Sequence, residues 1–381
     1  MLKSQTKRSK WGQSVLSGHS LANQQSEKRG GFTLLEIVVA VGVLAVVSAM
    51  VMSVFGRTRV PARRAQCDVQ LKQIALATDT FRQERGRMPA KLADLISAEY
   101  LTADAMRCPS DPDAEYDAKR VIDPTHTSYG DFYVIREPRD SGELPILVCP
   151  FHEKDGDFGI QAFKSGYTKQ FSAHPARLQA GEWSGVVTIS RPGVGVLSKP
   201  VAAGTPLLLR GGDKIDVGAG EALIRFEDGS TATIGNNSQM SVMQSFTEGQ
   251  RSGKLYTLVR QFKGKISYYV NPGNRFDVAT PTATAGALGT RFSIELLDNN
   301  NPNLVGSTPA PLLTKLVVEE HVVALSSVER TIEIVEGDQV VENSLASKIK
   351  IRKPRILTKS NRPTTRPTTT PTTTPRDDDD D

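Results

Sequence analysis

Cysteines and one histidine are the residues of this sequence with the most distinctive chemistry. Cys67, Cys108 and Cys149 are the three cysteines of a 381-residue chain that also contains five histidines. Three cysteines are too few for a disulfide scaffold, although one pair can form and leave one thiol over. In an exported domain, Cys108 and Cys149 are the candidate pair. With His152 they offer only three soft ligands, whereas a structural zinc site needs four, so we expect no metal and no cofactor.

A second group, Glu153, Asp155 and Asp157, alternates oxygen ligands as calcium-binding loops do. The fuller calcium-loop spacing is missing, which favours a solvated acidic turn. The sequence also lacks the phosphate-binding loop, the serine-hydrolase elbow, the zinc-protease helix motif and any Cys-x-x-Cys pair. We therefore expect no catalytic residues and a chain that is not an enzyme.

The element that must position the N-terminal part of the chain is an apolar run from Phe32 to Phe55, which contains one charge, Glu36. As a helix it would be roughly 36 Å long, enough to cross a bilayer. Residues 1–31 carry the whole net charge of +5 and form a basic leader. This distribution argues against a nucleic-acid-binding domain and for a cytoplasmic N-terminus. A carboxylate in such a segment either lies at the membrane interface, where its side chain can reach water, or marks a functional site.

The residues around the start of the apolar run form a recognisable motif. They read Lys28-Arg29-Gly30-Gly31-Phe32-Thr33-Leu34-Leu35-Glu36. This segment closely resembles the prepilin peptidase site of type IV pilins and type II secretion pseudopilins. The resemblance implies cleavage after Gly31, N-methylation of Phe32 as the new N-terminal residue, and a role for Glu36 in assembly.

The same resemblance implies partners and a location. Prepilin peptidase and other pilin or pseudopilin subunits would be the partners. The chain would be a single-pass protein of a bacterial inner membrane, with its bulk in the periplasm or in an extracellular filament. In a filament core, Glu36 of one subunit can neutralise the terminal amine of a neighbour, which recovers much of the cost of burying a lone charge.

Residues 56–180 continue the resemblance as a pilin-like α+β lobe. Apolar residues at 3- and 7-residue spacings predict that the transmembrane helix over 32–55 continues to about residue 85. These residues are Leu71, Ile74 and Phe81. Pro61 is expected to kink or restart the helix.

The second half of the chain changes to short β-rich runs separated by turn signals. Asp228-Gly229, between two alternating runs, predicts a hairpin. We expect an all-β sandwich or barrel-like domain over 181–346. The tail over 347–381 is basic, then Thr-Pro-rich and finally poly-Asp, and should be extended and disordered.

Two stretches of the β-rich half resemble the FecR domain. One runs from Gly212 to Ser230, and the other joins Phe276-x-Val278-Ala279-Thr280-Pro281-Thr282-Ala283 to Gly289-Thr290-Arg291-Phe292. An insertion rich in Asn and Pro, 298–311, is expected to form an exposed loop. Since FecR domains occur in many architectures, the resemblance does not by itself imply a signalling role.

Two classes of function follow from these resemblances. In the first, the chain is a structural, pilin-like subunit of a type II secretion or type IV pilus-like filament, with its FecR-like domain as an exposed recognition module for an unknown ligand. In the second, it is a membrane-anchored FecR-type sensor that signals across the membrane. The second class usually carries a cytoplasmic domain of several dozen residues, whereas only about 31 residues precede the apolar run here. The sequence favours the first class.

Overall fold

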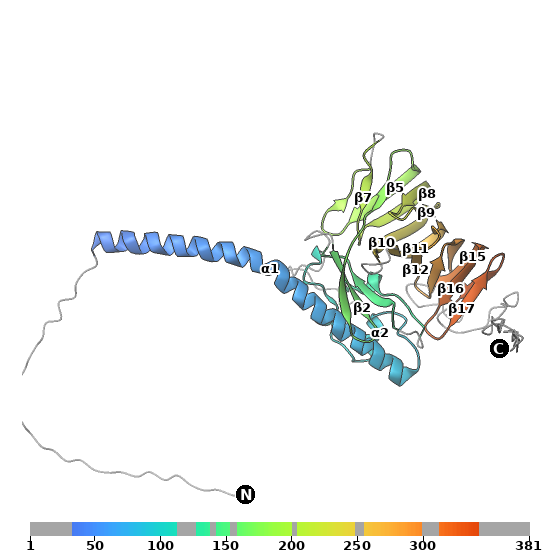
Figure 1. Cartoon of the computed structure of the whole chain (residues 1–381), viewed down its shortest axis with the longest axis horizontal. Coiled ribbons are helices and arrows are strands. Elements are labelled where there is room, and N and C mark those ends of the chain that lie inside the picture. The colour runs from blue at the N-terminus through green and yellow to red at the C-terminus, as the bar shows by residue number, and fades with distance from the viewer. Residues whose placement is uncertain are drawn as a thin grey trace, which may run out of the picture. The chain divides into compact units, whose positions relative to one another are not determined.

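The chain divides into two compact units in a computed structural model, residues Met1–Arg57 and Thr58–Asp381 (Figure 1). The structure describes residues 33–112, 127–137, 142–152, 158–199, 204–247, 255–298 and 312–342. The predicted leader, the acidic turn over 153–157, the insertion after Asp298 and the tail over 347–381 lie outside these ranges.

One long helix, α1 (Leu34–Arg85), begins in the first unit and ends in the second. Its end agrees with the predicted limit near residue 85. Pro61 lies inside this single helix, so the restart expected there does not occur, although proline removes one N–H from the helix ladder. Among the residues that the structure describes, no helix has the length and apolar character needed to cross a membrane. The predicted span includes residues 51–55, whose side chains lie outside the described residues.

The second half of α1 forms the wall of a small α+β lobe. Its predicted apolar stripe is confirmed, because Leu71, Ile74 and Phe81 are buried. The stripe packs against α2 (Ala93–Ser97), the 3-10 turn η1 (Ala103–Met106) and the inner side of a three-stranded antiparallel sheet. The strands of this sheet are β1 (Pro145–Cys149), β2 (Phe158–Phe163) and β3 (Thr168–Ser172), and a second 3-10 turn, η3 (Gly130–Phe132), precedes them.

A larger sheet follows, and within the described residues the chain after the lobe contains strands and turns without an α-helix. Its strands are β4 (Ala176–Leu178), β5 (Trp183–Arg191), β6 (Gly195–Val196), β7 (Leu207–Leu209), β8 (Lys214–Arg225), β9 (Thr231–Ile234), β10 (Ser238–Thr247), β11 (Leu255–Tyr269), β12 (Arg275–Ala279), β13 (Thr284–Leu288), β14 (Arg291–Asp298), β15 (Leu312–Glu320), β16 (Val322–Ser326), β17 (Thr331–Val335) and β18 (Gln339–Glu342). The all-β character expected for the second half is therefore confirmed.

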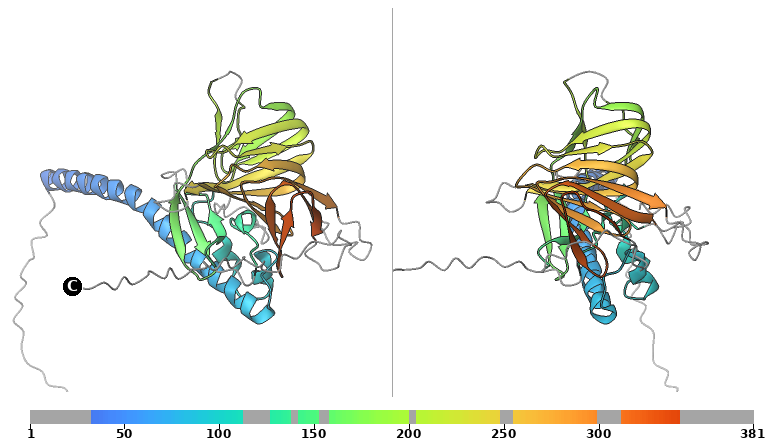
Figure 2. Two further views of the ribbon diagram at one scale, coloured as in Figure 1. Left: turned by 45° about the vertical axis from the view of Figure 1, so that its right-hand side comes forward. Right: turned by 90° about the vertical axis from the view of Figure 1, so that its right-hand side faces the viewer.

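The sheet is organised around its longest strand, β11. One half of β11 pairs with β10 and, in parallel, with β12, while its other half pairs with β9 and β14. Figure 2 shows the strands side by side, from the green strands through the yellow and orange ones to the red C-terminal strands. The inward side chains of these strands form one apolar core, which includes Ile224, Tyr268, Phe276 and Phe292.

The hairpin expected at Asp228-Gly229 joins β8 to β9. Gly229 has a φ of +84°, which glycine adopts without strain. The Asp228 carboxylate accepts hydrogen bonds from the backbone N–H of Ser230 at 2.9 Å and from its hydroxyl at 2.7 Å. The local sequence therefore supplies both the backbone freedom and the side-chain acceptor that this turn requires.

The lobe and the larger sheet share an interface within the second unit. β4 belongs to the larger sheet although it lies before residue 181, where the β domain was expected to begin. A separate apolar cluster joins Phe132, Val148 and Phe171 of the lobe to Phe246 and Tyr256 of the sheet. The lobe and the larger sheet therefore pack directly against each other.

Candidate functional site

Four side chains with metal-ligand chemistry meet in the core of the lobe. Cys67 comes from α1, Cys108 follows η1, Cys149 ends β1, and His152 lies in the turn after β1. Their sulfur and nitrogen atoms all lie within 4.8 Å of one another, and all four residues are buried. We call Cys67, Cys108, Cys149 and His152 the Cys3His cluster.

All three cysteines of the cluster are free thiols in the structure, where Cys108 and Cys149, the candidate disulfide pair, are not bonded to each other. Their sulfur atoms lie 3.6 Å apart, much farther than the about 2.05 Å of a disulfide bond. Cys108 Sγ also lies 3.7 Å from His152 Nε2. The sequence offered two sulfurs and one imidazole for this site, whereas the fold brings a third sulfur to the same place.

That third sulfur belongs to Cys67, which the sequence analysis left out of the site. Cys67 is four residues before Leu71 and seven before Ile74, so it lies on the same buried face of α1. This helical spacing is the sequence signal that could have identified Cys67 as a core residue. It places Cys67 in the core, but no sequence pattern shows which residues of the lobe will face it.

Polar groups surround the sulfurs of the cluster. The backbone N–H of Ser110 donates to Cys108 Sγ at 3.4 Å, and the Tyr129 hydroxyl lies 3.3 Å from Cys67 Sγ. The same hydroxyl donates to Gln70 Oε1, one turn along α1 from Cys67. The Ser110 N–H therefore supplies a donor to Cys108 Sγ, whereas the Tyr129 hydroxyl, whose proton goes to Gln70, accepts from the Cys67 thiol.

The cluster separates the acidities of its three thiols. Burial raises the pKa of Cys108, but hydrogen bonds from Cys149, Cys67 and His152 outweigh this effect and lower it. The hydrogen bond with Cys108 raises the pKa of Cys67, and burial raises the pKa of Cys149. The three thiols therefore differ in acidity, and Cys108 is the most acidic of them.

The N-terminal processing site is described only in part. Gly31 and Phe32 lie outside the described residues, while Thr33 and Glu36 form a reciprocal cap at the start of α1. The Glu36 carboxylate accepts from the Thr33 backbone N–H at 3.1 Å, and the Glu36 backbone N–H donates to the Thr33 hydroxyl at 3.3 Å. This Thr-x-x-Glu arrangement is a capping box, so Glu36 has a local structural role besides any role in assembly.

A buried ionic cluster joins the lobe to the larger sheet. Arg136 of the lobe donates to Asp277 on β12 at 2.5 Å and to the Tyr256 hydroxyl on β11, which itself donates to Asp277 at 2.5 Å. The Arg275 Nε lies 3.2 Å from the other carboxylate oxygen. Burial raises the pKa of Asp277, but Arg136 and Arg275 outweigh it and hold that pKa below its usual value.

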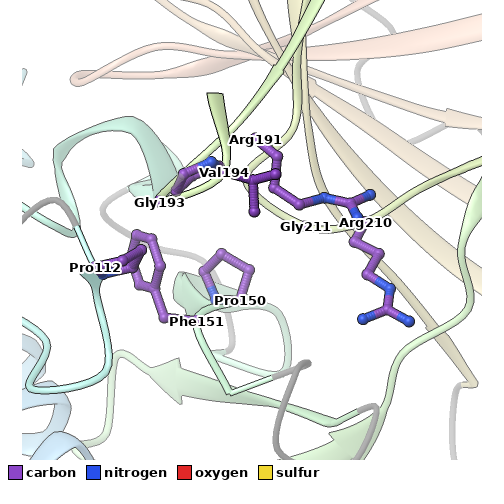
Figure 3. Close-up of a pocket in the computed structure, with 9 residues that line it drawn as sticks. Pro112, Pro150, Phe151, Arg191, Gly193, Val194, Arg210 and Gly211 are labelled. Atoms are coloured by element: carbon purple, nitrogen blue, oxygen red, sulfur yellow. The ribbon is translucent and has the colours of Figure 1, made fainter. Parts of the chain in front are cut away.

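A hollow of about 240 Å³ is lined by residues of both the lobe and the larger sheet, which Figure 3 shows. Its walls are mostly proline, glycine and apolar side chains, with two arginines at one side. The guanidinium of Arg191 is paired with Asp213 at 2.7 Å, so its charge is already balanced. The lining does not define a ligand class.

Comparisons with known proteins confirm both resemblances drawn from the sequence. Residues 27–52 match the prokaryotic N-terminal methylation motif, and residues 213–304 match the FecR protein family. The first match contains Gly31, Phe32 and Glu36, and it implies processing by prepilin peptidase and an inner-membrane anchor. No curated protein matches the chain.

The solved structures to which this chain is similar include two crystal structures of a protein from Parabacteroides distasonis described as a "putative anti-sigma factor". They are 18% and 19% identical to this chain, with TM-scores of 0.27 and 0.28. Each alignment covers 37% of this chain and 60% of the other, so the chain spans less than two thirds of the length of these structures.

Proposed function

We propose that this chain is a pilin-like structural subunit and not an enzyme. Prepilin peptidase cuts it after Gly31, and the new amino terminus at Phe32 is methylated. The first part of α1 anchors the subunit in the inner membrane and then packs with the helices of other subunits in a type II secretion or type IV pilus-like filament. The FecR-like sheet is displayed as a recognition module.

The match of residues 27–52 to the methylation motif carries this proposal. The exposure of the first part of α1 agrees with it. Apolar side chains there are more than half exposed in the single chain, including Leu34, Ile37, Val41 and Leu44. Exposed apolar surface on this scale needs lipid or neighbouring helices to cover it. Pilin assembly supplies both in turn.

The alternative is a membrane-anchored regulator, and the match to the FecR family is the observation that favours it. The two functions differ in the fate of residues 1–31. A regulator needs its N-terminal segment in the cytoplasm, whereas a pilin-like subunit loses that segment before assembly.

The test is the N-terminus of the full chain purified from membranes of cells that contain a prepilin peptidase. N-terminal sequencing and intact-mass measurement should show a chain that begins at Phe32 and carries one methyl group on its amine. Gly31→Glu should leave the leader attached, because a charged side chain then faces the peptidase. Lys3→Glu, far from the scissile bond, is the matched control and should be processed normally. A membrane chain that begins at Met1 in the presence of active peptidase would refute the pilin-like function and favour the regulator.

A further inference from the structure

We propose that Cys67, Cys108, Cys149 and His152 bind one Zn²⁺ ion as a structural site. This inference is independent of the proposed function, because it rests only on the geometry of the lobe. The site connects three segments that are distant in sequence: the second half of α1, the loop after η1, and the end of β1 with its following turn.

The donor set is one of those that structural zinc sites use, three cysteines and one histidine. Tetrahedral coordination with Zn–S bonds of about 2.3 Å and a Zn–N bond of about 2.0–2.1 Å places neighbouring donor atoms about 3.5–3.8 Å apart. The distance of 3.6 Å between the sulfur atoms of Cys108 and Cys149, and that of 3.7 Å between Cys108 Sγ and His152 Nε2, already match these donor separations. The remaining pairs lie within 4.8 Å, so the donors need to move little to close around an ion.

The charges of the cluster also favour a divalent cation. Zinc binds cysteine as the thiolate, so all three thiols must lose their protons. Three buried thiolates without a cation would repel one another strongly, whereas zinc leaves a net charge of −1. The backbone N–H of Ser110 lies where it can donate to the bound sulfur of Cys108.

The chemistry expected of this site is structural and not catalytic. Four protein donors complete the tetrahedral shell and leave no open position for water or substrate. The cluster is enclosed by the apolar core of the lobe, which includes Leu71, Met106, Ile146 and Ile160. Bound zinc would thus link α1 to the other elements of the lobe through the core that they share.

The experiment measures zinc and thiols in the full-length chain, extracted in detergent and purified without reductant. Elemental analysis by inductively coupled plasma mass spectrometry should find about one zinc ion per chain. A chromogenic thiol reagent in guanidinium chloride with chelator should then count three thiols per chain. X-ray absorption at the zinc edge should show three sulfur ligands and one nitrogen ligand.

Variants test whether the ion sits in the Cys3His cluster. His152→Ala and Cys67→Ser should each lower the zinc content at least about fivefold, because three ligands hold zinc much more weakly than four. His321→Asn is the matched control. His321 lies at an exposed turn with a φ of +61°, which asparagine tolerates, and its replacement should leave the zinc content unchanged.

Several outcomes would overturn the proposal. One thiol per chain without zinc would show that two of the cysteines form a disulfide. Three thiols and no zinc, even after incubation with zinc chloride, would show a metal-free cluster. Another metal in place of zinc would refute the assignment of the ion, and zinc that persists in both cluster variants would place it elsewhere. The wild-type measurements decide the matter even if a variant fails to fold.

Discussion

The replacement Asp277→Asn should destabilise the second unit far more than an ordinary loss of a surface charge. The Asp277 side chain is fully buried, and the Arg136 side chain that pairs with it is 4% exposed. The amide keeps the shape of the carboxylate but removes its charge. The guanidinium of Arg136 then remains buried without a counter-ion.

The size of the effect follows from the contacts that remain. Removing one partner of a buried ion pair costs about 3–5 kcal/mol. Arg136 keeps its hydrogen bonds to the Pro145 carbonyl and to the Tyr256 hydroxyl, so we expect the lower end of this range, about 3 kcal/mol. With a urea m-value of about 1–3 kcal/mol/M, the denaturation midpoint should fall by about 1–3 M.

Tryptophan fluorescence provides the assay. The chain has two tryptophans, Trp11 in the leader and Trp183 on β5, so the chain without its leader reports from Trp183 alone. Urea denaturation in a mild detergent gives the midpoint. Glu320→Gln is the matched control, because it makes the same carboxylate-to-amide change in the Arg291–Glu320 pair, whose side chains are about half exposed. Its effect should stay within about 0.5 kcal/mol.

A second substitution at Arg136 tests the same buried pair. Arg136→Met removes the stranded charge, so the Arg136→Met/Asp277→Asn double variant should be more stable than the sum of the two single effects allows. If Asp277→Asn shifts the midpoint no more than Glu320→Gln, or if the two single effects simply add, the buried pair does not hold the lobe and the sheet together.

Three further predictions concern other parts of the chain. Gly289→Ala should destabilise the second unit by at least about 1 kcal/mol more than Gly273→Ala in the same urea assay, and equal denaturation midpoints would contradict this. Both glycines have a positive φ, but only a Cβ at position 289 would meet Pro272 Cα, at 2.8 Å. Glu36→Gln keeps the capping box but removes the charge, so if charge pairing drives assembly, the recovery of partner subunits in a pull-down should fall as far as it does with Glu36→Ala. Near-normal recovery with Glu36→Gln, together with poor recovery with Glu36→Ala, would show that Glu36 acts only as a helix cap. Because the folded-state pKa of Asp277 is depressed, the stability that this carboxylate contributes is present above its unfolded pKa of about 3.9 and is lost as the pH falls further. The free energy of unfolding of Asp277→Asn should therefore change less than that of the wild type between about pH 5 and pH 3.

Features that depend on neighbouring residues were predictable from the sequence. The Asp228-Gly229 turn needs a flexible residue beside a short polar side chain, and both are adjacent in the chain. The buried stripe of α1 follows from a spacing of 3.6 residues per turn, which Leu71, Ile74 and Phe81 satisfy. The cleavage motif is likewise a local pattern, and the family comparison found the same segment.

Features that depend on distant pairings were not predictable in the same way. Arg136 is 141 residues from Asp277, and no periodicity links the two. Cys67 and Cys149 lie on a helix and at the end of a strand, and only the packing of the lobe decides that their sulfur atoms meet. The place of β4 was likewise not predictable, because this strand is too short to stand out in the sequence and joins the larger sheet by pairing with β7 and β8.

The interface between the lobe and the sheet has a consequence for the proposed function. It is held at separate places, by the Arg136–Asp277 pair, by a hydrogen bond from the Met88 N–H to the Val328 carbonyl, and by one from the Arg260 guanidinium to the Tyr133 carbonyl. Contacts at β11, at β12 and at the turn after β16 together resist rotation better than a single contact does. A partner that pulls on the FecR-like sheet would therefore transmit its load to the lobe, and from there through the Cys3His cluster to α1. A recognition module that is fixed in this way would report the orientation of its filament, whereas one on a flexible tether would not.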